Sequence, residues 1–137
     1  MNRTPSENTK PVFLYAGTPT SGFTSAELDC TGFDNGHVTI LVATATGSAS
    51  AITTIKVQEA ATSGGGLTDI TNAAFTNIST SNDGELQAAS IQLRGTEKFL
   101  KVIGTGGGSN DAPIVITAVL SGASNSASND VTFVFEV

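Results

Sequence analysis

Two alternating runs decide the fold of this chain: His37-Val38-Thr39-Ile40-Leu41-Val42-Ala43 and Ile52-Thr53-Thr54-Ile55-Lys56-Val57-Gln58-Glu59. Val38, Ile40 and Val42 share one face of the first run, and Ile55 and Val57 share one face of the second. An apolar residue at every second position is typical of a β-strand that buries one face. We therefore expect both runs to be strands, paired as a hairpin at the centre of an all-β domain.

Further strand candidates lie on both sides of this central pair. They are residues 12–15, 23–30, 69–78, 86–93, 98–103, 113–120 and 131–137. Turn-forming residues separate them, and the i, i+3, i+4, i+7 spacing of an amphipathic helix is missing. About eight or nine short strands predict an antiparallel β-sandwich, either a jelly roll or an immunoglobulin-like fold.

Two of these strands carry more specific expectations. In residues 86–93, Leu86 is out of phase with Ile91, which predicts a bulge or bend between them. Residues 113–120 are apolar on both faces apart from Thr117, as in a strand with neighbours on both sides. We expect this strand to be central in its sheet.

The length of 137 residues suits one domain with its own hydrophobic core. The first residues are polar, and Pro5 and Pro11 discourage a helix there. We therefore predict an extended N-terminal arm over residues 1–11 and a single β-sandwich domain over residues 12–137.

The charge pattern restricts the possible partners. A formal net charge of −6 with only six scattered basic residues argues against binding a nucleic-acid backbone. No apolar run approaches ~18 residues, so no membrane segment is expected, and the absence of a secretion signal predicts synthesis in the cytoplasm. Only 13% of the residues are charged, and Ser, Gly and Ala lose little side-chain entropy on contact. This composition favours an assembly component.

Two residues are candidate catalytic groups by residue type. His37 is the only histidine, and nothing in the spacing of Ser and Asp residues around it indicates a catalytic triad. Cys30 lies between Leu28 and a turn, where a small buried apolar role fits better than that of a nucleophile. We predict no catalytic residue and no enzyme activity.

A glycine-rich segment and a set of acidic residues near turns are candidate ligand sites. Residues 104–109 are glycine-rich, but a phosphate cradle needs a helix N-terminus after the loop, and a strand led by Pro113 follows instead. Acidic residues near turns could offer oxygen ligands to calcium, without the spacing of a known calcium loop; they are Asp83, Glu85, Asp111 and Asp130. We predict no cofactor and no metal site.

Residues 28–122 resemble a group of small virion proteins of tailed phages that are encoded beside the major capsid gene. The resemblance is carried by residues 28–34, 38–42, 56–59, 67–70, 91–95, 98–102 and 120–122. In this group the matching segments form a turn with glycine or an aromatic residue, a central hairpin, a basic-aromatic strand and a final strand. The chain departs from the group in its three consecutive glycines, where an Asp-Gly turn is usual.

The resemblance implies a capsid decoration, or cement, protein that binds the major capsid protein on the outer surface of the phage head. The predicted contacts with such a partner are Arg3, Lys10, Val12 and Phe13, in and just after the arm. Phe133, Val134 and Phe135 form an apolar strand that should pair within the sandwich or in a homo-oligomer, a dimer or trimer.

Two other roles stay open at this point. One is a different phage structural component, such as a tail or head fibre. The other is a carbohydrate-binding module on the same fold, although the chain has no Trp and one Tyr to stack on a sugar.

Overall fold

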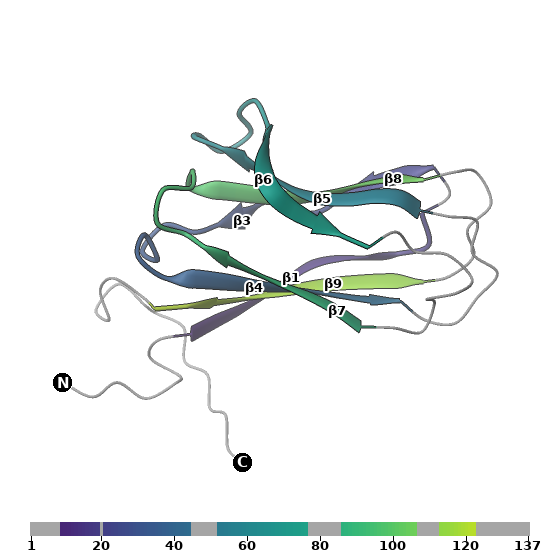
Figure 1. The fold of residues 1–137 in the computed structure, drawn as a ribbon, viewed down its shortest axis with the longest axis horizontal. Helices are drawn as coiled ribbons and strands as arrows, with labels where there is room; N and C mark the ends of the chain where they lie inside the picture. Colours follow the sequence, from purple (N-terminus) through teal and green to yellow (C-terminus); the bar gives the residue numbers. More distant parts are fainter. Residues whose placement is uncertain (1–8, 20, 45–51, 77–85, 107–112, 123–137) are drawn as a thin grey trace, which may run out of the picture.

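The computed structural model describes residues 9–19, 21–44, 52–76, 86–106 and 113–122, which form two antiparallel sheets packed face to face (Figure 1). The strands are β1 (Thr9–Gly17), β2 (Gly22–Thr24), β3 (Leu28–Asp29), β4 (His37–Thr44), β5 (Ile52–Ala60), β6 (Thr68–Phe75), β7 (Leu86–Gln92), β8 (Phe99–Gly106) and β9 (Ile114–Ser121). The described residues contain no helix. The prediction of an all-β sandwich is confirmed.

The strand order is that of a jelly roll. Sheet A contains β1, β9, β4 and β7 in that order, and sheet B contains β2, β8, β5 and β6, with β3 also paired to β8. β2 and β3 pair in succession with the edge of β8 that faces away from β5, so together they act as one interrupted strand. Among the resulting eight strands, only β5 and β6 follow each other within one sheet, which fits a jelly roll and excludes the immunoglobulin order.

The core lies between the sheets and consists of inward side chains from every strand. Its fully buried large members are Leu28, Val38, Ile40, Val42, Ile55, Val57, Leu100, Ile114, Ile116 and Leu120. They alternate with outward residues along β4 and β9, as the period-two pattern requires.

The expected central hairpin is wrong. β4 pairs with β7 and β9 in sheet A, whereas β5 pairs with β6 and β8 in sheet B. Alternation shows only that each run has one buried face. In a sandwich that face packs on the opposite sheet, whether two strands share a sheet or lie in different sheets. Short turns of two to five residues favour a hairpin, whereas residues 45–51 separate β4 from β5.

The boundary of the expected N-terminal arm is also corrected. Thr9, Lys10 and Pro11 belong to β1 and pair with Ser121, Leu120 and Val119 of β9. Because β1 is at the edge of sheet A, the missing N–H of Pro11 is tolerated in the strand. Residues 1–8 of the arm lie outside the described residues.

The structure also tests the expectations for two further strands, β9 and β7. β9 lies between β1 and β4, so its central position is confirmed. β7 pairs with β4 without a register shift, so the expected bulge after Leu86 is wrong, and Leu86 is simply an exposed outward residue. The predicted strand over residues 131–137 lies outside the described residues.

A close approach between β2 and β8 gives a test of the packing. Gly104 pairs with Phe23, whose ring lies where a β carbon on Gly104 would be placed. We expect Gly104→Ala to lower the free energy of unfolding by about 1–3 kcal/mol, because the Phe23 ring must move and its stacking on Tyr15, at 4.6 Å between centroids, is disturbed. Urea denaturation measures the effect.

Gly66→Ala is the matched control, since nothing lies within 4 Å of a β carbon there. It should change stability by no more than about 0.5 kcal/mol. Adding Phe23→Leu to Gly104→Ala should recover part of the loss in a double-mutant cycle. Equal stability of the two alanine variants would show that the ring does not restrict this position.

Candidate functional site

The outward side chains of sheet A form one continuous surface without a charged residue. The registers of the paired strands align them in four rows of four. The rows are Thr9, Ser121, His37 and Gln92; Pro11, Val119, Thr39 and Ser90; Phe13, Thr117, Leu41 and Ala88; and Ala16, Val115, Ala43 and Leu86. None of these residues is Asp, Glu, Lys or Arg. We call this surface the outer face of sheet A.

The exposed large hydrophobic residues of the described chain all lie on this face. Phe13 is 61% exposed, Leu86 65% and Val115 40%. Phe13 and Leu86 are on the two edge strands, and Val115 is on β9 between them. Exposed apolar residues are common singly, so a face that gathers all three of them is the candidate functional site.

The outer face of sheet B has the opposite character. Lys56 on β5 forms a salt bridge of 2.8 Å with Asp69 on β6, and the Gln58 amide donates a hydrogen bond of 2.6 Å to the same carboxylate. These bonds, the one from Lys56 first, lower the pKa of Asp69. Lys101 on β8 lies beside Gln58 in the register. The two outer faces therefore differ in charge.

A further polar contact holds the turn that follows β5. The Glu27 carboxylate accepts hydrogen bonds from the Gly64 amide, at 2.9 Å, and from the Ser63 hydroxyl, at 2.6 Å. These bonds, Gly64 first and then Ser63, lower the pKa of Glu27. Gly64 has a φ of 71°, in the left-handed region that glycine adopts without strain. The contact joins the glycine-rich turn to the segment between β2 and β3.

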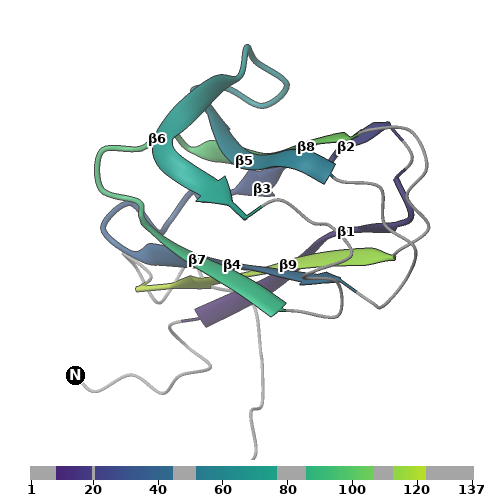
Figure 2. The same ribbon diagram turned by 45° about the vertical axis from the view of Figure 1, so that its right-hand side comes forward.

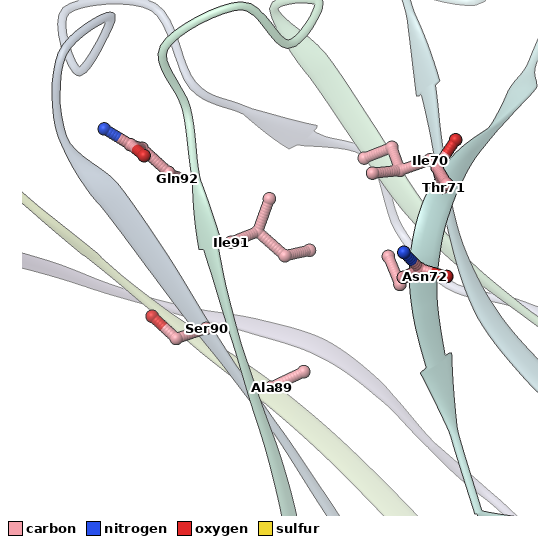
Figure 3. Close-up of a pocket in the computed structure, with 8 residues that line it drawn as sticks. Ile70, Thr71, Asn72, Ala89, Ser90, Ile91 and Gln92 are labelled. Atoms are coloured by element: carbon pink, nitrogen blue, oxygen red, sulfur yellow. The ribbon is translucent and has the colours of Figure 1, made fainter.

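A pocket of about 300 Å³ lies between β6 and β7, where the edges of the two sheets face each other (Figure 3). Ile70 on β6 and Ala89 and Ile91 on β7 point into the space between the strands (Figure 3). The other lining residues are Thr71, Asn72, Ala73, Ser90 and Gln92. This lining contains no ionisable side chain, so it can hold an apolar group but offers no acid or base.

A backbone irregularity in β6 opens this pocket. In the pairing with β5, Lys56 lies opposite Ala74 and Gln58 opposite Asp69, so that residues 70–73 face Val57 alone. Asn72 has a φ of 63°, a left-handed conformation that asparagine tolerates better than most residues. β6 consequently curves out of sheet B toward β7 (Figure 2).

A side chain links the two edge strands at the other end of the pocket. The Gln87 side chain of β7 accepts a hydrogen bond from the Thr76 amide, at 2.8 Å, and donates one to the Thr76 carbonyl, at 3.0 Å. Both bonds have the pattern of a strand-to-strand pair. The link keeps the end of β6 close to β7.

The structure places three of the predicted partner contacts in β1 and separates their roles. Phe13 is exposed on the outer face of sheet A, and its contact role stays a prediction. Val12 packs against the core, and Lys10 is half-buried opposite Leu120. The other predicted contacts, Arg3, Phe133, Val134 and Phe135, lie outside the described residues.

Cys30 is buried, as predicted. Burial raises the pKa of its thiol to about 12, with a smaller contribution from Asp29. His37, at the start of β4, is exposed in the first row of the outer face of sheet A. Across the part of the chain that the structure describes, no three His, Cys, Asp or Glu residues gather to hold a metal. Of the residues weighed as calcium ligands, Asp83, Glu85, Asp111 and Asp130 lie outside that part.

The surface around Phe13 could not be predicted from the sequence, and the contact role predicted for Phe13 itself stays a prediction. The outer face of sheet A combines four strands, and its rows depend on registers between segments up to about one hundred residues apart, as in the pairing of Phe13 with Thr117. One signal was available. β4, β7 and β9 contain no charged residue, and in β1 Lys10 is the only one.

Comparisons with known proteins found no match: no family model, no curated protein and no solved structure resembles the chain significantly. Within the described residues, no helix has the length and hydrophobicity needed to cross a membrane.

The buried thiol predicts slow chemical modification. Because the pKa of Cys30 is raised and the side chain is covered, the folded protein should resist maleimide at neutral pH and react only on unfolding. Mass spectrometry after timed labelling measures the rate. An Ala74→Cys variant, with a second thiol at an exposed position of β6, should gain one label at once. Equal rates at both sites would contradict the buried position of Cys30.

The Glu27 contact predicts a pH dependence in the acid range. Since the pKa of Glu27 is lowered in the folded protein, the contact is fully present above the ordinary glutamate pKa and is lost as the pH falls through the lowered value. In an NMR titration, the Gly64 amide proton should therefore shift with a midpoint below that ordinary pKa. Glu27→Gln should abolish the transition, and a midpoint at or above the ordinary pKa would refute the assignment.

Proposed function

We propose that the protein is a structural component of a virus particle, a decoration protein on the outer surface of a tailed-phage head. The observation that carries the proposal is the outer face of sheet A, a broad uncharged surface with Phe13, Leu86 and Val115 exposed. A protein that works through contacts with other subunits, including further copies of itself, needs such a face and needs no reactive group.

The composition of this face supports the proposal. Most of its residues are Ala, Val, Ser or Thr, whose side chains lose much less conformational entropy on contact than Lys or Glu. An uncharged face also avoids the cost of desolvating a charge against a partner. The strand order is a second support, because jelly rolls occur in viral capsid proteins, although lectins and cupins share them.

The pocket between β6 and β7 favours other roles less. Its described lining has no aromatic ring on which a sugar could stack, which weakens the carbohydrate-binding alternative. A tail or head fibre would use the same kind of uncharged face, so the number of copies per particle distinguishes it from a decoration protein.

The proposal predicts that the protein copurifies with intact phage heads. Quantitative mass spectrometry should give a ratio to the major capsid protein that is commensurate with icosahedral symmetry, because a decoration protein occupies equivalent sites on the shell. Heads that lack the protein should be less heat-stable and should regain stability when the purified protein is added.

A few copies per particle, located by electron microscopy at the tail or at one vertex, would assign the protein to a fibre instead. Detection in the infected-cell lysate but not in purified particles would refute a place in the virion.

A further inference from the structure

The outer face of sheet A is suited to contact with a second copy of the same chain. The chain has a formal net charge of −6, so two copies repel each other when their charged surfaces meet. Sheet B carries the Lys56–Asp69 pair and Lys101 on its outer side. Over the described residues, the outer face of sheet A lets two copies approach without opposing or desolvating any Asp, Glu, Lys or Arg side chain.

The size of the face reaches the lower limit for a specific contact. Four strands about 4.8 Å apart, each with about eight residues at about 3.4 Å, cover roughly 19 Å by 27 Å, or about 500 Å² in plan. The accessible surface of the projecting side chains exceeds this plan area. Two such faces would bury about 1,000 Å² or more, the lower size of specific protein interfaces.

The distribution of apolar residues favours self-contact over contact with a charged partner. Phe13 and Leu86 stand on opposite margins, and half-buried Leu41, Thr117 and Val119 lie between them. A partner with charges at this position would have to desolvate them against a surface that offers no ion pair. A second outer face of sheet A presents only apolar and small polar groups.

We propose that two copies of the chain associate through the outer faces of their A sheets, related by a two-fold axis. The two A sheets then pack face to face at about 10 Å, as sheets do within a sandwich. In such an isologous contact each residue of the face occurs twice, so one substitution changes the interface at two places. The inference concerns self-association and does not depend on a place in a phage head.

Matched charge substitutions in the full-length protein test the interface. Ala88 on β7 and Ala74 on β6 are both exposed on edge strands, the first on the outer face of sheet A and the second on that of sheet B. The wild-type protein should sediment as a dimer at micromolar concentration. Ala88→Glu should weaken the dimer about 100-fold or more, since two like charges enter the interface. Ala74→Glu should leave it unchanged.

Two further measurements locate the contact. Phe13→Glu on the opposite margin should also give monomers, with the wild-type circular dichroism spectrum as evidence of folding. In NMR spectra recorded on dilution, amide signals of β4 and β9 should move, whereas those of β5 and β8 should stay in place.

Three results would overturn the proposal. The first is a wild-type protein that stays monomeric, as it would if another part of the same chain covered the face. The second is a dimer that both Phe13→Glu and Ala88→Glu leave intact. The third is a loss of dimer in Ala74→Glu equal to that in Ala88→Glu. Binding to phage heads is measured separately from dimerisation. A protein that forms the dimer but is absent from virions would therefore refute the proposed function and leave the proposed interface valid.

Discussion

The contact between the inner faces of the two sheets is the constraint on which the rest of the structure depends. β4 and β9 contribute one side of it and β5 and β8 the other, with side chains that are almost completely buried. Burying each large aliphatic side chain contributes about 1.5–3 kcal/mol. Because every strand must turn its apolar positions inward, the outward positions are released for other uses. Residues that bind a partner can therefore lie only on the outer faces and edges of the sheets.

The outer faces use this freedom differently. Sheet B carries an ion pair and an amide that keep its outer face hydrated, at Lys56, Asp69 and Gln58. Over the described residues, the outer face of sheet A carries no Asp, Glu, Lys or Arg, although this sheet contains β4 and β9, whose inward residues form one side of the core. A charged residue at an outward position of β4 or β9 would not disturb the core, so folding alone does not explain its absence. An interface does.

The strands could be predicted from the sequence because alternation is a local property. The hydrogen-bonded partners of the strands could not be predicted in this way, as β4 and β5 show. Each has one apolar face, and that face is buried in the core whether the two strands share a sheet or lie in opposite sheets. The arm was drawn too long because Pro11 is incompatible only with an interior strand. For the candidate site, the sequence allowed Phe13 to be proposed as a contact, which stays a prediction. Its neighbours Thr117, Leu41 and Ala88 could not be foreseen, because they come from three distant segments.

The proposed dimer and the proposed attachment to a phage head are compatible if the outer face of sheet A joins two copies of the chain and the surfaces that the dimer leaves open contact the shell. With the outer faces of sheet A joined, the charged outer faces of sheet B point away from the interface, one on each side. A dimer then presents every shell contact twice. On a repetitive surface the second contact forms at high effective concentration once the first has formed, so individually weak contacts suffice for stable binding. In this way a chain with 13% charged residues would bind a shell firmly through many weak contacts.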